Sequence, residues 1–428
     1  MRSQKAFLFP ILFLGLAVLA FSNGLNLNGL GARAVSMGGA YTALANDFSA
    51  VYWNPAGLAG LGGKVFGFYG TDIIPSGTYK LTTSPSASPG GSLVLVDAKS
   101  VAKNYLAGMA AYIHPISSRL VAAFGVYTPS GLGAEWKSAD MAAISGGSTD
   151  IEWMSKVGLI TFAPSLAFQI SDTLSVGASL NINYGTFDIS MYAGSIPGVL
   201  DLGQYSETET GWGLGATFGI LFKPSKIVSL GAVLRTSSTV KFSGEAEMGR
   251  LIFLGLSTTS EMERNVTWPM EIKGGIAVTP TDALTLSADV HYTRWSVIDS
   301  LTTDYKDTFW SLLMTSSGKN VMAMHWKDAV QICLGGEYRL SPALALRAGY
   351  YYDPAPAPDE TMNILLPSYN FNALTLGAGY RMDGLMVDAG LEYLMGKERT
   401  IADTLPDATP GVYNMKILVP CVSIGYRF

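Results

Sequence analysis

Apolar and polar residues alternate along this chain from residue 64 onward. Period-two segments cover residues 174–184, 284–293, 374–381 and 387–393. In the first of them, the apolar positions are Leu174, Val176, Ala178, Leu180, Ile182 and Tyr184. The residues between them are Ser175, Gly177, Ser179, Asn181 and Asn183. A period of two is typical of a β-strand whose two faces meet different surroundings.

The alternating segments predict fourteen strands. We place them at 64–72, 104–115, 118–128, 157–170, 173–191, 211–222, 227–245, 266–279, 284–297, 328–340, 343–353, 371–382, 385–396 and 415–428. Short turns alternate with connections of roughly 15 to 30 residues. An even strand number with short turns on one side and long loops on the other indicates a bacterial outer-membrane barrel. Both chain ends would then lie on the periplasmic side.

The polarity of the two faces separates this barrel from a secreted β-sandwich, which also alternates. The positions predicted to face outward are Leu, Val, Ile and Tyr, whereas the inward ones are small or charged. The last strand carries Val422, Ile424, Tyr426 and Phe428 on one face, a pattern through which we expect the barrel-assembly machinery to bind. The expected fold class is therefore all-β, a 14-stranded antiparallel transmembrane β-barrel over residues 64–428 in the bacterial outer membrane.

The first 22 residues are predicted to be a signal peptide. Two positive charges, Arg2 and Lys5, precede an apolar run that ends in small residues compatible with cleavage after Ala20 or Ser22. The alternative is a membrane anchor, because the run approaches the length of a helical span.

Residues 23–63 are predicted to form a hatch inside the barrel. They are rich in glycine and small residues, yet they carry Phe48, Tyr52 and Trp53 beside Asn54, Pro55 and Ala56. A loop of this length and apolarity is uncommon unless it packs inside something. The mouth of the barrel provides such a place.

Composition excludes several functional classes. A net charge of −5 without a basic patch argues against nucleic-acid binding. The two cysteines, Cys333 and Cys421, are far apart and have no metal-ligand spacing. Ser287, Asp289 and His291 share one strand face, but Ser287 and His291 would be about 13 Å apart at a rise of about 3.3 Å per residue. We therefore expect no enzyme, metal or other cofactor.

Several motifs resemble the amino-terminal hatch of the FadL family. They are Gly29-Leu30-Gly31-Ala32-Arg33-Ala34, Met37-Gly38-Gly39-Ala40, Ala45-Asn46-Asp47 and Asn54-Pro55-Ala56-Gly57-Leu58. Further pieces follow in family-like order, among them Trp268-Pro269, Tyr292-Thr293-Arg294-Trp295-Ser296 and Trp326-Lys327-Asp328-Ala329. The resemblance covers nearly the whole chain after the signal peptide. Members of this family import long-chain fatty acids or hydrophobic hydrocarbons across the outer membrane.

The resemblance implies a monomeric, passive transporter with three sites. Arg33, Asn54, Pro55 and Ala56 would hold the hatch in place. A lateral exit into the lipid of the outer membrane would lie where the third strand kinks, at Gly125, Thr128, Pro129, Ser130 and Gly131. A loop run that is expected to be exposed would capture the hydrophobic ligand, with Leu251, Ile252, Phe253, Leu254 and Leu256.

The nature of the cargo stays open in the sequence. Long-chain fatty acids are the first expectation, but Thr186 and Thr302 stand where the fatty-acid importer carries basic residues, which favours a neutral or aromatic hydrocarbon. Arg33, Arg339, Arg347 and Arg381 are candidates to replace those basic residues. A water-filled porin and a purely structural barrel are the remaining alternatives.

The inward face also carries charges of both signs, which are expected to pair with one another across neighbouring strands. They are Asp289, His291, Glu337, Arg339, Arg347, Arg381, Asp388 and Glu392.

Overall fold

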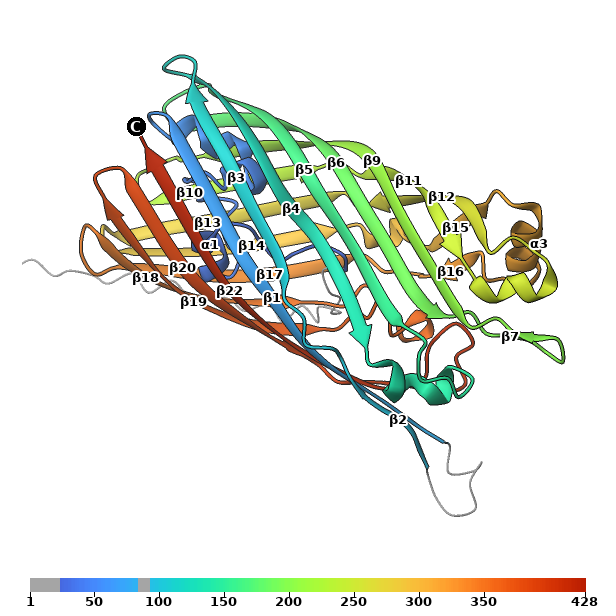
Figure 1. The fold of residues 1–428 in the computed structure, drawn as a ribbon. Coiled ribbons are helices and arrows are strands. Elements are labelled where there is room, and N and C mark those ends of the chain that lie inside the picture. Colours follow the sequence, from blue (N-terminus) through green and yellow to red (C-terminus); the bar gives the residue numbers. More distant parts are fainter. Residues whose placement is uncertain (1–23, 84–92) are drawn as a thin grey trace, which may run out of the picture.

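The chain folds into a closed antiparallel barrel of 14 strands (Figure 1). The structure, a computed structural model, describes residues 24–83 and 93–428, so the expected signal peptide lies outside the described residues. The wall consists of β1 (Val65–Thr82), β3 (Tyr105–Pro115), β4 (Leu120–Trp136), β5 (Trp153–Gln169), β6 (Leu174–Tyr192), β9 (Gln204–Phe222), β10 (Val228–Arg235) with β11 (Ser238–Glu247), β12 (Thr259–Trp268) with β13 (Glu271–Thr281), β14 (Leu284–Thr293), β17 (Ala329–Arg339), β18 (Leu344–Asp353), β19 (Phe371–Met382), β20 (Leu385–Gly396) and β22 (Gly411–Arg427). The first strand pairs with the last, which closes the ring.

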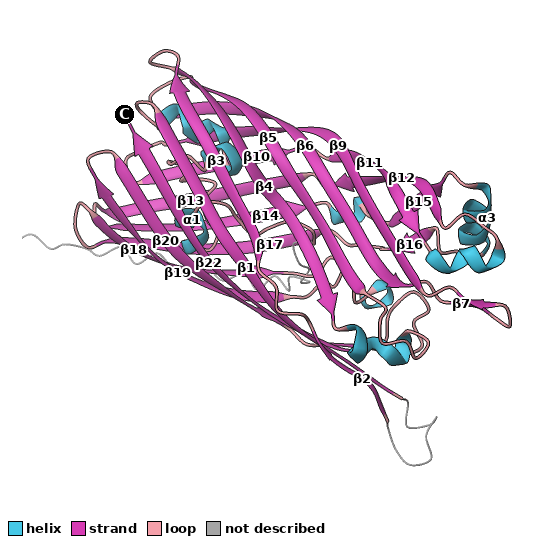
Figure 2. Cartoon of the chain, in the orientation of Figure 1, coloured by secondary structure: helices cyan, strands magenta, loops and turns pink. Residues whose placement is uncertain are grey.

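The remaining elements lie inside the barrel or at the long-loop end, as Figure 2 shows. Inside are α1 (Ala32–Ser36), α2 (Ala50–Trp53) and η1 (Pro55–Gly60). The others are β2 (Val94–Lys99), η3 (Ser138–Ile144), β7 (Ser195–Ile196), β8 (Leu200–Asp201), η4 (Gly249–Leu254), η5 (Trp295–Val297), β15 (Ser300–Tyr305), α3 (Thr308–Ser316), β16 (Val321–Ala323), η6 (Asp359–Thr361) and β21 (Arg399–Ile401). None of the helices in the described part of the chain has the length and apolarity to cross a membrane.

The predicted strand number is confirmed, and the main differences lie inside two strands. The predicted strand 227–245 is broken in the middle, into β10 and β11. The predicted strand 266–279 is broken near its start, between β12 and β13, because β12 begins earlier, at Thr259. Pro269 lies in the second break and has no N–H for the ladder. Because β10 pairs with β13 and β11 pairs with β12, the two breaks lie side by side.

The faces of the wall are arranged as the pattern predicted. Outward side chains such as Leu214 and Leu376 are 65% and 62% exposed, whereas the inward Asp289 and Glu337 are each 2% exposed. Apolar side chains on the outside and polar ones inside are the arrangement of a barrel surrounded by lipid.

Residues 24–63, the lumen segment, fill the barrel near the short-turn end (Figure 1). Glycines in the wall provide room for this segment. A Cβ atom on Gly219 of β9 would lie 2.1 Å from Asn54 Oδ1, and one on Gly177 of β6 would lie 2.3 Å from the carbonyl carbon of Pro55. The wall therefore lacks side chains where the lumen segment makes its closest contacts.

Candidate functional site

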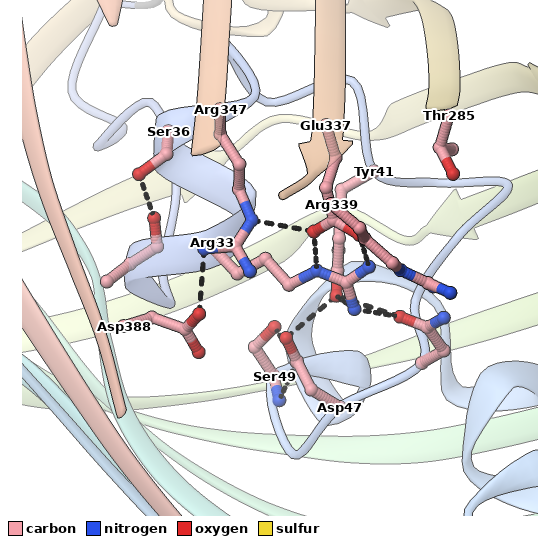
Figure 3. Close-up of polar contacts among 12 residues, drawn as sticks. Arg33, Ser36, Tyr41, Asp47, Ser49, Thr285, Glu337, Arg339, Arg347 and Asp388 are labelled. Atoms are coloured by element: carbon pink, nitrogen blue, oxygen red, sulfur yellow. Dashed lines mark hydrogen bonds and ion pairs between the residues drawn. The ribbon is translucent and has the colours of Figure 1, made fainter. Parts of the chain in front are cut away.

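Arg33 anchors the lumen segment to the wall through a buried ionic network (Figure 3). Its guanidinium donates two hydrogen bonds to Glu337 of β17, at 2.7 and 2.9 Å. Arg347 of β18 donates to the same carboxylate at 2.7 Å and also pairs with Asp388 of β20 at 2.7 Å. Arg339, in contrast, is half-exposed and lies 3.8 Å from Glu337. The bidentate pair between Arg33 and Glu337 fixes the orientation of the lumen segment as well as its position.

Asn54 joins the lumen segment to a different part of the wall, strand β9. Its Nδ2 donates to the carbonyl oxygens of Thr42 and Ile220, at 2.9 and 3.0 Å, and its Oδ1 accepts from Ala56 N at 3.1 Å. Asn54 is the N-cap of η1, which begins at Pro55, where a missing N–H costs nothing. Asn54, Pro55 and Ala56 are fully or nearly fully buried.

The wall has a window between β3 and β4. The ladder between them ends at Met109 and Tyr127, although β3 continues to Tyr105 and β4 to Trp136. Toward the long loops β4 stays paired with β5. The register of that pairing shifts between Tyr127 and Ser130, in a stretch that contains Pro129. Such an irregularity bends a strand and interrupts its pairing.

Hydrogen bonds close the window at both ends, below toward the short turns and above toward the long loops. Below it, Gly108 N donates to Thr128 Oγ1 at 2.9 Å. Above it, Val101 N donates to the carbonyl oxygen of Glu135 at 2.8 Å. The opening is therefore a bounded gap rather than a split that runs along the whole barrel.

The start of the lumen segment runs along the inner edge of this window. Leu27 N donates to the carbonyl oxygen of Pro129 at 2.9 Å, and Gly131 N donates to that of Leu25 at 3.1 Å. The Ser130 hydroxyl donates to Asn26 Oδ1 at 2.8 Å. The lumen segment thus adds a short strand to β4 on the side where β4 is no longer paired with β3.

A cavity of about 310 Å³, the chamber, connects the lumen to this window. Its inner wall includes Asn28 of the lumen segment, Tyr69 of β1 and Glu392 of β20. Its outer wall includes Leu106, which is 82% exposed, and Ile160 of β5. Because one cavity has both inward and outward side chains in its lining, it passes through the barrel wall. Its volume lies in the range of small-molecule sites.

The long connection at residues 354–370, between β18 and β19, covers the chamber on the side of the long loops. Its buried residues include Ile364, Leu365 and Tyr369, and Trp136 Nε1 donates to the carbonyl oxygen of Ile364 at 3.0 Å. The same connection contributes Pro367, Ser368 and Tyr369 to the chamber. The chamber therefore lies between this connection and the lumen segment.

Three of the predicted exit residues line the chamber and two do not. Thr128, Ser130 and Gly131 line it, whereas Pro129 contributes only its carbonyl oxygen to the contact with Leu27. Gly125 lies lower, where a Cβ atom would be 2.7 Å from Val51 of α2. The predicted hatch residues also lie outside the chamber lining. The sequence reasoning missed Glu392 and Tyr369 as chamber residues, because their role depends on which strands close the ring.

The predicted capture residues lie at the long-loop end and do not line the chamber. Ile252, Phe253 and Leu254 of η4 are 61%, 76% and 39% exposed, but Leu251 is fully buried in a cluster with Trp310 and Met314 of α3. The expectation that the whole run is exposed therefore holds for only part of it.

An ion pair fastens η4 to the β7–β8 hairpin. Arg250 pairs with Asp201 at 2.7 Å. The backbone N–H of Gly203 and then the Arg250 guanidinium lower the pKa of the Asp201 carboxyl, because both stabilise its charged form. The exposed apolar side chains of η4 are thus presented by a loop with defined contacts.

In the predicted row of Ser287, Asp289 and His291, it is Asp289 that anchors the lumen segment. Asp289 Oδ2 accepts from Tyr41 N at 3.0 Å and from Thr42 N at 2.7 Å. His291 contacts Gln331 at 3.0 Å. Within residues 24–83 and 93–428, no group of three or more His, Cys, Asp and Glu is arranged to hold a metal ion.

A closed barrel with a filled lumen and a lateral window belongs to the outer-membrane class. The model of the family described as outer membrane protein transport protein (OMPP1/FadL/TodX) matches residues 14–428, and the chain belongs to this family. Membership places it among transport proteins rather than enzymes, in the outer membrane.

Two relatives and two solved structures show the extent of the likeness. Outer membrane protein P1 of Haemophilus influenzae is 23% identical over 67% of this chain, and the match spans 65% of that protein's length. The long-chain fatty acid transport protein of Escherichia coli K12 is 24% identical, over 88% of this chain and 89% of the relative. The crystal structure of a Pseudomonas aeruginosa FadL homologue has a TM-score of 0.75 at 19% identity, covering 95% of this chain and 100% of the other. The Ralstonia pickettii toluene transporter TbuX has a TM-score of 0.70 at 19% identity, covering 94% and 99%. These structures support the fold.

Proposed function

We propose that this protein is a passive conduit that takes up hydrophobic molecules and releases them sideways into the outer membrane. The exposed side chains of η4 capture the molecule from outside. It then enters the chamber, whose lining is mostly apolar, and leaves through the window between β3 and β4. The protein acts as a monomer, and neither a cofactor nor an energy source is required, because an apolar molecule gains free energy when it partitions into lipid.

The observation that carries this proposal is the chamber that passes through the wall. Tyr184 and Trp212 contact each other on the outward face, with ring centroids 4.9 Å apart. Beyond them the outward positions of β6 and β9 become polar, at Thr186, Asp188 and Thr210. Aromatic residues mark the membrane interface. Tyr184 and Thr186 also line the chamber, so its opening lies near the outer interface of the bilayer.

The lumen segment acts as the hatch in this proposal. Arg33 and Asn54 fasten it to different sides of the wall, so that it blocks an axial water path. A water-filled porin needs an open lumen, and the buried lumen segment argues against that alternative. The same proposal places the end of the signal peptide at residue 22 and the end of the hatch at residue 63.

The cargo we propose first is a long-chain fatty acid. The name of the Escherichia coli relative supports it. Neutral hydrocarbons are the second candidate, since Thr186 lies in the chamber lining and Thr302 lies in β15, and neither provides a cation. The toluene transporters among the solved structures agree with that second candidate.

Blocking the window tests the proposed route. A Cβ atom on Gly131 would have only Leu27 Cδ2 near it, at 3.9 Å, so Gly131→Trp fills the opening without a backbone clash. Gly274→Trp is the matched control, because Gly274 is on the exposed face of β13 with nothing within 4 Å. We expect uptake of a labelled long-chain fatty acid, and of toluene, by cells lacking their own importer to fall at least tenfold in the first variant only. Unchanged uptake of both compounds in Gly131→Trp would exclude lateral release through this window.

A further inference from the structure

The charged groups of the chamber point to the kind of head group that its ligand carries. We propose that the chamber recognises an uncharged polar group, such as the hydroxyl of a long-chain alcohol, and rejects an ionised carboxylate. This inference rests on the proposed uptake of hydrophobic molecules and specifies the ligand class of the same cavity. A fatty acid would then enter in its protonated form.

Two carboxylic acids lie in the chamber wall. Glu392 of β20 and Asp353 at the end of β18 are 5% and 4% exposed, and both line the cavity. Glu392 accepts a hydrogen bond from the Tyr351 hydroxyl, which in turn accepts one from Asn28 Nδ2 at 2.6 Å. The lumen segment and two wall strands therefore hold Glu392 in a fixed position beside the ligand space.

Four cations of the lumen are bound away from the chamber. Arg33 and Arg347 pair with Glu337, and Arg235 and Lys273 pair with Glu271, at 2.7 and 3.2 Å. Among the described residues that line the chamber, Lys156 is the one cation. Its side chain is exposed on the outward face of β5, opposite Asp188 of β6 in the strand register. It therefore lies outside the window, whereas the two acids lie inside.

This distribution of charge sets the selectivity. An ionised ligand head in the chamber would lie near like charges in a partly desolvated space, which disfavours it. An uncharged hydroxyl meets no such repulsion and can donate to a carboxylate, whose oxygens have several acceptor sites.

Tyr369 supplies a second group for such a ligand. It lines the chamber, it is 1% exposed, and its hydroxyl has no hydrogen-bond partner among the described residues. A buried hydroxyl without a partner is costly, and a ligand oxygen that accepts from it removes that cost. Because Tyr369 lies on the connection 354–370, ligand binding would also hold this connection over the chamber.

Binding to the purified protein in lipid nanodiscs tests this inference. The probes are dodecanol, dodecanoate and dodecane, compared by calorimetry at about pH 9, where the acid is ionised. We expect dodecanol to bind at least tenfold more tightly than dodecanoate. Glu392→Gln should reduce the ratio of the dodecanoate Kd to the dodecanol Kd, because it removes a carboxylate and keeps the side chain's size. Tyr369→Phe should weaken dodecanol binding and leave dodecane binding unchanged.

A control variant separates local from general charge effects. Glu261→Gln removes one negative charge from an exposed position on β12 and should leave all three affinities unchanged. Dodecanoate binding as tight as dodecanol, or the same ratio in Glu392→Gln and wild type, would overturn the inference while the proposed function stands. Binding of none of the three probes would instead remove the proposed function itself.

Discussion

Leu27 donates its backbone N–H to the carbonyl oxygen of Pro129, 2.9 Å away. The first residues of the lumen segment are thereby paired with the strand that forms one side of the window. If the lumen segment moves, either its hydrogen bonds to β4 break or β4 moves with it, and in both cases the edge of the window changes. This relationship gives the first prediction.

Leu27→Pro removes that N–H and should loosen the edge of the window. We expect the amide of Gly131, which donates to Leu25, to exchange with deuterium at least tenfold faster, because the short added strand loses one of its two backbone hydrogen bonds. Leu27→Ala keeps the N–H and serves as the control. Hydrogen-exchange mass spectrometry on peptides covering 129–133 measures the effect. Equal protection in both variants would show that the contact does not restrain β4.

Arg33→Ala should release the lumen segment from β17. Removal of one partner of a buried ion pair costs about 3–5 kcal/mol, since Glu337 is left buried with Arg347 as its remaining close partner. We expect a lower unfolding temperature and higher ion conductance in planar bilayers. Arg339→Ala is the control, because Arg339 is half-exposed and 3.8 Å from the same carboxylate. Wild-type conductance in Arg33→Ala would indicate that Asn54 and Asp289 suffice to hold the segment.

Gly219→Val should displace η1 from the wall. Its Cβ atom would lie 2.1 Å from Asn54 Oδ1, so that the cap of η1 has to move. We expect a folded barrel, seen as a heat-modifiable band on gels, with increased leakage of small solutes. Gly274→Val, on the lipid-facing side of β13, should behave as wild type. Leakage in neither variant would argue against tight packing of η1 on β9.

Substitutions in η4 should separate capture from loop stability. Phe253→Asp removes an exposed apolar side chain, so we expect slower uptake at low ligand concentration and an unchanged unfolding temperature. Leu251→Asp instead buries a charge in the cluster around Trp310, so it should destabilise the outer loops and increase their cleavage by protease. Uptake assays combined with limited proteolysis distinguish the two outcomes. Normal uptake by Phe253→Asp would remove η4 from the capture step.

The sequence predicted the barrel because period two is a local property that survives in every strand. The kink of the third wall strand came from the family resemblance, which places it within residues 125–131, and the register shift between Tyr127 and Ser130 lies in that range. The continuation of β4 to Trp136 was missed, because the outer half of that strand is held by β5 and by residues 100–101, which only the folded ring brings near. For the same reason the sequence predicts an ion pair for Glu392, whereas its hydrogen-bond partners are the side chains of Tyr351 and Asn28.

The lumen segment was easier to recognise than its contacts. Its glycine-rich, aromatic composition distinguished it from an ordinary loop, and Arg33 and Asn54 were singled out. Their partners, Glu337 and the carbonyl oxygen of Ile220, come from distant strands, and no spacing in the sequence encodes them. The resemblance to a known family indicated which residues hold the segment, and the period-two pattern of the strands carries no such information.

Closure of the ring between β1 and β22 has a consequence for biosynthesis. The ribosome makes the lumen segment before the wall and makes β22 after the other wall strands. Ala32 N donates to Ser423 Oγ at 2.8 Å, across 391 positions of the chain. Until β22 arrives, β1 has an unpaired edge and the segment has no complete pocket. Contacts this distant in sequence form slowly. The nascent protein therefore needs protection of its open edge through nearly the whole of its assembly.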